Sequence, residues 1–240
     1  MAMFGLFGGK SEAAQLKKLA ERVANKRSQS PDRWEAIEAL AKMHTAEAVA
    51  ALLPRFTFYV EPSISDQEEK DAAFSGVVAA GSAAVGPIVA FLKRAESISW
   101  PVKMLERIAG PEALVERLLE LLAGMDTEYE RDPQKKIQVL AELEDRRDPR
   151  IGPAVLRFLS DANETVRFHA ACTLLGQTDA AEHRATLAAR IQHEESVRVR
   201  VRILDGFVQK GWPIEDAPSG LIARLPTGFS LDGKGAISKK

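Results

Sequence analysis

The histidines and the single cysteine are the side chains of this 240-residue chain that could ligate a metal or attack a substrate. The histidines are His44, His169, His183 and His193. Their spacing contains no i, i+4 pair with a third ligand, so we predict no metal centre. Cys172 stands within an apolar helical pattern without a nearby His/Asp partner set, where a cysteine fills core volume. We expect no catalytic residues and no cofactor.

An acidic cluster and an arginine run offer two other kinds of chemistry. The cluster "DTEYERD", residues 126–132, holds paired carboxylates, but it falls at a predicted turn, where such residues cap helices. The run "VRVRVR", residues 197–202, is dense in arginine. On a helix, successive arginines two residues apart differ by about 200° in direction, so they form no single stripe. We interpret the cluster as a solvated turn and the run as no nucleic-acid groove.

Charge and composition exclude further classes. Lys+Arg total 33 and Asp+Glu total 34, a net charge of −1 that creates no general attraction for nucleic acid. One cysteine allows no intrachain disulfide, which favours a cytoplasmic protein. The start, "MAMFGLFGGK", is too short and lacks the basic residue of a signal peptide, and no apolar run approaches the roughly 20 residues of a membrane span. We predict a cytoplasmic protein that spans no membrane.

Helical periodicity and internal repetition identify the elements that position these residues. Apolar residues recur at i, i+3, i+4 and i+7, with breaks every dozen or so residues. "VGPIVAFLKRA" at 85–95 matches "IGPAVLRFLSD" at 151–161, an offset that two units of about 33 residues explain. A second helix in each unit follows the stripe of Val166, Ala170, Ala171 and Leu174, which recurs from Val199 onward. We prefer Val199 to Val197 as the last anchor, because it keeps every stripe position apolar.

The stretch "DANETVRFHAACTLLG", residues 161–176, carries a resemblance to a family. An Asp, four further residues and then Val-Arg, followed by Ala-Ala and Leu, resembles the HEAT repeat, in its phycobilisome-lyase-like bacterial variety. In that family the acid and the base form a ladder between repeats. The resemblance carries over to Asp161 with Arg167, to Glu194 with Arg200 and to Glu130 with Lys136, while Arg33 matches alone and Ala72 and Pro101 interrupt the ladder.

The resemblance covers roughly residues 30–210 and implies an all-α fold, a right-handed α-solenoid of about five to six hairpins. We expect an N-terminal segment with a capping helix (1–29; helix at 11–27), a repeat array (30–211) and a C-terminal part (212–240). Around Asp232-Gly233 that last part is either a small hairpin with a type I′ turn or a loose tail. A long linker is expected at 54–70, where Phe56, Phe58 and Tyr59 either pack on the first hairpins or belong to a functional loop.

Such repeats serve mostly as interaction scaffolds, so we expect a non-enzymatic scaffold whose partner is another protein or a peptide. The expected binding residues follow the anchors of the second helices: Val102, Lys103, Ile137, Gln138, Phe168, His169, Val201 and Arg202. The alternative is that the apolar members wedge against the next repeat. A HEAT-like DNA-binding or DNA-repair glycosylase is the second functional hypothesis, although Trp34, Trp100 and Trp212 are scattered and the charge is balanced. A phycobilin lyase is a third, resting on the repeat alone.

Overall fold

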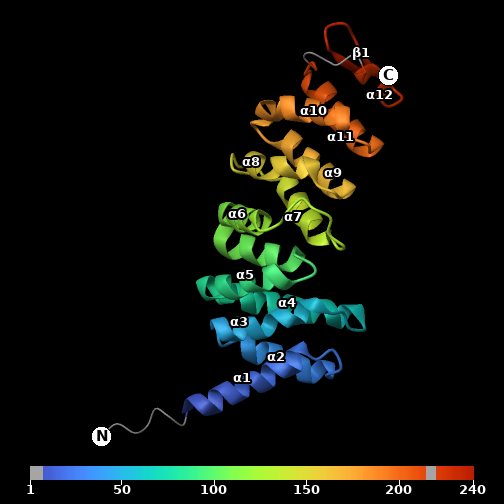
Figure 1. Cartoon of the computed structure of the whole chain (residues 1–240). Coiled ribbons are helices and arrows are strands. Elements are labelled where there is room, and N and C mark those ends of the chain that lie inside the picture. The colour runs from blue at the N-terminus through green and yellow to red at the C-terminus, as the bar shows by residue number, and fades with distance from the viewer. Residues whose placement is uncertain (1–7, 215–219) are drawn as a thin grey trace. The chain divides into compact units, whose positions relative to one another are not determined.

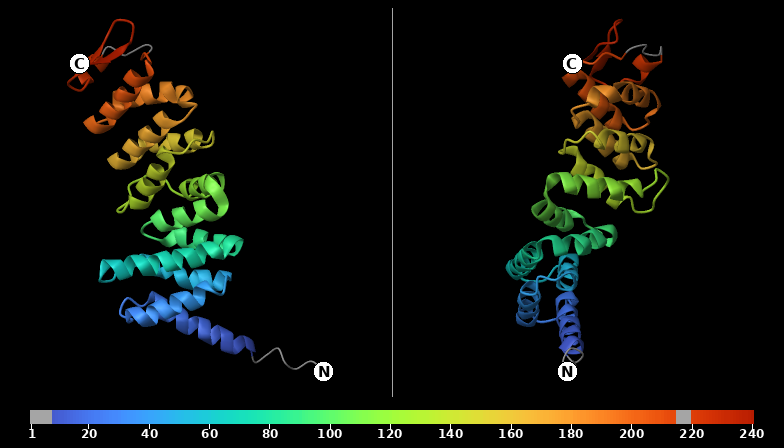
Figure 2. Two further views of the ribbon diagram at one scale, coloured as in Figure 1. Left: turned by 180° about the vertical axis from the view of Figure 1, so that it is seen from behind. Right: turned by 90° about the vertical axis from the view of Figure 1, so that its left-hand side faces the viewer.

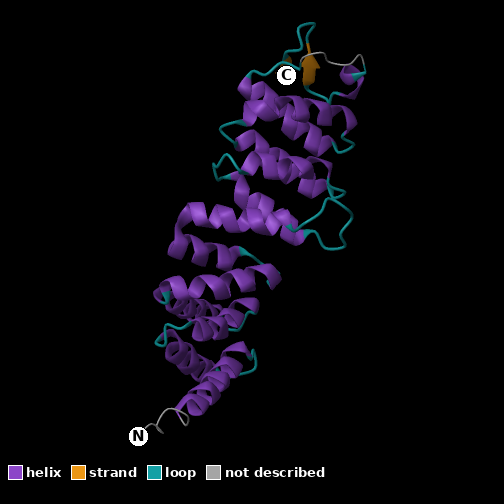
Figure 3. Ribbon diagram, turned by 60° about the vertical axis from the view of Figure 1, so that its left-hand side comes forward, coloured by secondary structure: helices purple, strands orange, loops and turns teal. Residues whose placement is uncertain are grey.

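The computed structural model describes residues 8–214 and 220–240, and over these ranges the chain is mainly α-helical. The helices dominate Figure 3, and the described strands are a short pair near the C-terminus. The expected all-α class is confirmed at this level. The chain divides into two compact units, residues 1–117 and 118–240, so the division falls inside the predicted 30–211 array.

The first unit is built from helices that pack on their neighbours in sequence. Its elements are α1 (Gly8–Ala24), α2 (Ser30–Ala41), α3 (Ala46–Leu52), the 3-10 helix η1 (Leu53–Thr57), α4 (Ser63–Ala79), η2 (Gly81–Ala84), α5 (Val85–Arg94) and the start of α6 (Ser99–Ala123). Helix α1 packs on α2 and α3, α2 packs on α4, and α3 packs on α5 (Figure 1). Within α6, Gly110 adopts φ 86°, and Pro111 follows it, so the helix bends there.

The second unit repeats a pattern of a first helix, a turn and a second helix. After α7 (Gln134–Glu144) come α8 (Ile151–Val155), η3 (Leu156–Ser160), α9 (Glu164–Gly176), η4 (Ala180–His183), α10 (Arg184–His193), α11 (Val197–Lys210) and α12 (Leu221–Arg224). The second helices α7, α9 and α11 lie side by side in that order (Figures 1 and 2). α9 therefore contacts the second helix before it and the second helix after it.

The apolar stripes of the second helices form the core of this unit. Val166 on α9 and Val199 on α11 are fully buried, as are the stripe residues that follow them, whereas Val197 is 56% exposed. The choice of Val199 as anchor is confirmed. Burying each large aliphatic side chain stabilises the fold by about 1.5–3 kcal/mol. The turn residues fix where the helices begin, since the Asn163 side chain accepts from the N–H of Val166 and Ser196 from that of Val199.

The segment 54–70 is not the long linker that its sequence predicts. Helix α4 begins at Ser63, and η1 ends at Thr57, so a short connection, 58–62, remains. The polar run "SDQEEK" lacks the apolar spacing of a packed helix, because two of its acids are buried through ion pairs and not through apolar contacts. Asp66 is 5% and Glu69 0% exposed. The N-terminal helix also differs, running over Gly8–Ala24 instead of 11–27. The apolar residues 1–7 lie outside the described ranges.

The C-terminal part forms a hairpin, as one of the two expectations had it. Strand β1 (Phe229–Leu231) pairs antiparallel with β2 (Ile237–Lys239), with Leu231 opposite Ile237. The type I′ turn is wrong, because the left-handed residue is Gly235, φ 81°, and Asp232 N–H donates to the Ala236 carbonyl across a three-residue loop. The Asp232 carboxylate closes this wider loop by accepting from the N–H groups of Lys234 and Ala236.

The hairpin is held against α11. Ile214 N–H donates to the Gly235 carbonyl at 2.8 Å, and Lys239 Nζ lies 2.7 Å from the Asp205 carboxylate. Ile214 and Leu221 are each 2% exposed. The described residues beyond 211 therefore pack on the last second helix.

A close approach of α4 to α2 at Gly76 makes a testable prediction. A Cβ at this position would lie 2.5 Å from Ala41 Cβ and 2.9 Å from Ala41 Cα, so Gly76→Ala must push the helices apart. We expect a loss of about 1–3 kcal/mol in urea unfolding. Gly86→Ala on α5 is the matched control, because nothing lies within 4 Å of its Cβ position and alanine favours a helix by about 0.5–1 kcal/mol. Equal unfolding midpoints for the two variants would contradict this packing.

Candidate functional site

The bases and acids that the sequence singled out meet between successive hairpins of the second unit. Lys136 Nζ on α7 lies 2.9 Å from Asp161 Oδ2 in the next interhelix turn. Arg167 on α9 donates from Nε and Nη2 to the Glu194 carboxylate at 2.9 and 2.8 Å. Each acid also accepts at 2.8 Å from the backbone N–H two residues later. We name these two contacts the rungs; each joins a base to the acid of the following hairpin.

The rungs are buried and electrostatically coupled. Asp161 is 2%, Glu194 0% and Lys136 1% exposed. Burial by itself raises the pKa of Glu194, but hydrogen bonds from Arg167, Ser196 N–H and Arg190 outweigh it and lower that pKa to about 2. Burial lowers the pKa of Lys136, yet its hydrogen bond to Asp161 leaves it raised overall. Glu194 is therefore ionised at neutral pH, and Lys136 is charged.

At the first and last members of the ladder, the contacts differ from the pairs that the sequence predicted, Glu130 with Lys136 and Glu194 with Arg200. Glu130 is a weak partner for Lys136, at 3.4 Å and half exposed, and the same Nζ donates to the Asp126 carbonyl in the turn. Arg200 forms no ion pair within the described residues. It donates to the Arg224 carbonyl at 2.6 Å instead, because each base reaches forward to a following hairpin and α11 is the last second helix described.

The first unit satisfies its buried charges with a different network. Glu69 on α4 accepts from Arg33 at 2.6 Å and from Arg55 at 2.7 Å, and Arg55 also donates to Asp66 at 2.7 Å. Lys70 Nζ completes it, 2.6 Å from Asp66. Burial raises the pKa of both acids, but these hydrogen bonds more than offset it, so both pKa values lie below their ordinary range.

Of the residues in this network, the sequence pattern indicated only Arg33 as a base of the ladder. It placed an interruption of the ladder at Ala72. A signal was available in the i, i+3 spacing of Asp66 and Glu69, which puts two acids on one face of α4. Arg55, fully buried between them, was missed because its partners come from another helix.

Three contacts join the exposed side of α9 to the helices beside it. The Arg198 guanidinium of α11 covers the Phe168 ring, 3.8 Å from its centroid, and Arg202 Nε donates to Cys172 Sγ at 3.1 Å. On the other side, His169 Nδ1 pairs with the Glu144 carboxylate of α7. We name this surface the α9 face; it consists of Glu144, Phe168, His169, Cys172, Arg198 and Arg202.

The predicted binding residues fall into two groups. In the second unit they are half-buried on adjacent second helices: Ile137, Gln138, Phe168, His169, Val201 and Arg202. In the first unit, Val102 is a wrong choice, because it is 3% exposed and belongs to the core. Lys103 is exposed beside it, with Nζ 5.1 Å from the centroid of the Trp100 ring. Apolar spacing alone did not separate an open position from a covered one.

On the α9 face, Arg202 contacts a neutral group and not a carboxylate. Burial raises the pKa of Cys172, although its hydrogen bond from Arg202 acts in the opposite direction. Cys172 is therefore a neutral thiol at physiological pH, and a weak acceptor. In the part of the chain that the structure describes, no carboxylate pairs with Arg202.

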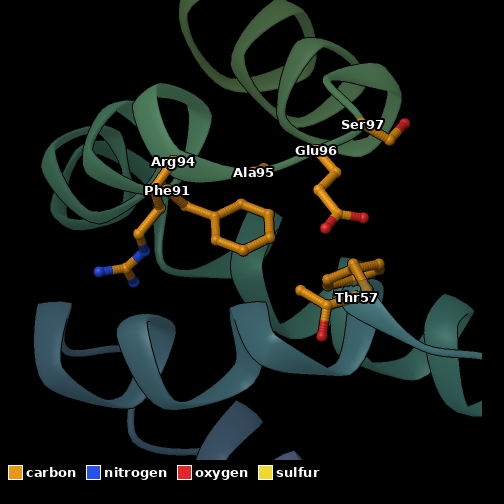
Figure 4. A pocket seen from close by; sticks show the side chains of 7 residues that line it. Thr57, Phe91, Arg94, Ala95, Glu96 and Ser97 are labelled. Atoms are coloured by element: carbon orange, nitrogen blue, oxygen red, sulfur yellow. The ribbon is translucent and has the colours of Figure 1, made fainter. Parts of the chain in front are cut away.

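A separate pocket of about 530 Å³ lies in the first unit between η1 and the end of α5. Figure 4 shows the Phe91 ring and the Glu96 carboxylate directed into it, with Thr57 opposite and the Arg94 guanidinium turned away. Phe56 also lines it and packs against Trp100, with ring centroids 4.8 Å apart and ring planes tilted by 44°. The volume suits a small molecule, but the Glu96 carboxylate is the one charged group of this lining that is directed into it, beside the hydroxyls of Thr57 and Ser97.

The aromatic residues at the start of the predicted linker have separate environments. Phe58 is half-buried under the Arg55 guanidinium, 4.7 Å from the ring centroid, whereas Tyr59 is 44% exposed. They form no continuous apolar patch.

Residues 8–214 and 220–240 contain no group of three or more His, Cys, Asp or Glu placed to hold a metal ion. No single helix there is long and apolar enough to cross a membrane; Ser63–Ala79 and Gly81–Arg94 meet the length and composition criteria only as a pair bent by 115°. Comparison of the chain with protein-family models, curated proteins and solved structures finds no match.

The Arg167 rung predicts a stability difference between two arginines. Arg167→Ala removes the bidentate partner of the buried Glu194, and we expect it to cost about 1–3 kcal/mol in the free energy of unfolding. Arg198→Ala should cost less than about 1 kcal/mol, because its ion pair with Glu164 is half exposed. Chemical denaturation of both variants measures this. A larger loss for Arg198→Ala would mean that the rung does not hold the hairpins.

The depressed pKa of Glu194 predicts acid sensitivity. The unfolded side chain titrates near 4.5 and the folded one at about 2, so the stabilisation is complete above pH 4.5 and is lost as the pH falls toward 2. Asp66 and Glu69 act in the same direction. We expect the melting temperature to decrease over this window and to decrease less in Glu194→Gln, which starts lower at neutral pH. Parallel melting curves for the two proteins would remove Glu194 as a cause.

Proposed function

We propose that this chain is a HEAT-like α-solenoid of bacterial type that acts as a non-enzymatic scaffold for protein–protein interaction in the cytoplasm. The observation that carries the proposal is the repeated rung. A base on one second helix binds the buried acid at the next turn, at Lys136–Asp161 and again at Arg167–Glu194. A repeated contact of this kind favours stacked hairpins in one register, which is the organisation of a repeat protein.

The side chains of the second helices support interaction as the role. Ile137, Phe168 and Val201 occupy equivalent positions on α7, α9 and α11, and each remains partly exposed. Polar side chains lie directly beside them, as in the rim of a protein-binding surface. We infer that a partner helix or extended peptide packs across these three helices.

The polar groups on this surface favour non-covalent binding over chemistry. His169 is paired with Glu144, and Cys172 is a largely buried neutral thiol rather than a nucleophilic thiolate. Neither contact pairs an activated nucleophile with a general base. The surface is therefore suited to recognition.

A double variant tests the surface. Phe168→Glu with Ile137→Glu places two charges on it, and we expect it to abolish capture of the partner by the immobilised full chain while the melting temperature changes by only a few degrees. Glu142→Gln combined with Arg131→Gln, which removes one charge of each sign elsewhere on this unit, is the control and should retain capture. Retained binding by the folded Phe168/Ile137 variant would eliminate this surface, and unfolding would assign both residues to the core.

A further inference from the structure

Arg202 is a half-buried cation whose visible acceptor is a thiol. Its Nε lies 3.1 Å from Cys172 Sγ, and the described residues provide it with no carboxylate. Charged groups that lose part of their hydration are ordinarily compensated by an opposite charge. The guanidinium of Arg202 therefore retains donors and a positive charge for a group outside the chain.

Arg198 stands one helical turn before Arg202 on α11, so the two side chains share one side of that helix. The Arg198 guanidinium lies over the Phe168 ring, and its side chain is 51% exposed. The sequence pattern suggested that the arginines of this run diverge. The structure separates only Arg200, which reaches the Arg224 carbonyl; Arg198 lies over the Phe168 ring, and Arg202, one turn later, contacts Cys172, one turn after Phe168 on α9.

The nearby carboxylates are already engaged. Glu144 pairs with His169, and Glu164 accepts from Ser196 Oγ at 2.9 Å and from Arg198 at 3.3 Å. Glu144 and Glu164 lie at the edges of the surface and limit the extent of its positive charge. A continuous polyanion such as nucleic acid would lie against them, whereas a ligand with a few carboxylates set among apolar residues would avoid them.

We propose that the α9 face binds an acidic, apolar peptide segment of a partner protein, with carboxylates on Arg202 and Arg198 and an apolar side chain against Phe168. This proposal rests on the proposed function and names the chemistry of the partner. Guanidinium–carboxylate contacts supply direction and selectivity, and the contact with Phe168 supplies buried apolar area.

The test uses the full chain and a short fluorescein-labelled peptide in which Glu residues alternate with pairs of Leu, compared with the same peptide carrying Gln for Glu. Fluorescence anisotropy should show binding of the Glu peptide that weakens with added salt. Arg202→Gln should weaken it about ten-fold or more, since a charge-assisted hydrogen bond contributes about that factor. Arg131→Gln, an exposed arginine of the same unit for which the described residues show no ion pair, is the matched control and should leave affinity unchanged.

The single cysteine locates the bound peptide. Cys172 contacts Arg202, so bound Glu peptide should further slow the already slow alkylation of this buried neutral thiol by iodoacetamide, followed over hours, and the Gln peptide should not. Circular dichroism of Arg202→Gln verifies that the variant is folded. Equal binding of the two peptides, unchanged affinity in Arg202→Gln, or binding of a DNA duplex through Arg198 and Arg202 in place of the peptide would overturn the proposal.

The outcomes also separate this proposal from the scaffold function. Capture of a partner that depends on Phe168 and Ile137 but is unaffected by Arg202→Gln would leave the scaffold in place and reject the acidic chemistry. Capture that depends neither on Phe168 and Ile137 nor on Arg202 would reject the surface altogether.

Discussion

The buried acid at the interhelix turn is the constraint on which the second unit depends. Asp161 and Glu194 are almost completely withdrawn from water, and a carboxylate in that position is costly unless hydrogen bonds and a cation compensate it. The turn provides one donor through its own backbone, and the preceding second helix provides the cation. The acid is satisfied only when successive hairpins adopt one spacing, so the same contact that compensates its charge also sets the packing register.

The first unit meets the same electrostatic demand without repeating the same contact. Glu69 on α4 receives two arginines, Arg33 from α2 and Arg55 from η1, and Asp66 shares Arg55. Three elements are thereby joined through one carboxylate and its neighbour. These acids lie within α4 and not in the turn before it. The helix therefore includes a polar stretch that the sequence pattern assigned to a linker, and this stretch is part of the packed unit.

These internal pairings determine what remains for recognition. Most acids near the second helices of unit two are committed to a base of the chain itself, through the rungs, His169 or Arg198. The cations are not all committed in the same way, since Arg202 has only a thiol among the described acceptors, and Arg198, over the Phe168 ring, has one half-exposed ion pair with Glu164 at 3.3 Å. A surface with satisfied acids and incompletely satisfied cations selects partners by their carboxylates, and its apolar residues add contact area without specificity of charge.

The sequence by itself determined the helical class and the anchor at Val199, because each depends on neighbours within one helix. It left the C-terminal part open between a hairpin and a loose tail, and the structure decided for the hairpin. The sequence also marked Asp161, Arg167, Glu194 and Lys136 as one set. Tertiary structure decided which of them meet, since Lys136 binds an acid 25 residues ahead and Arg167 one 27 ahead.

Tertiary structure likewise decided that Val102 is covered, that Glu69 compensates Arg33 and that Arg202 faces Cys172. The physical reason is that helical periodicity reports which side of a helix a residue occupies. The identity of what lies against that side depends on the distance and register of another helix, and these are established only when the helices pack.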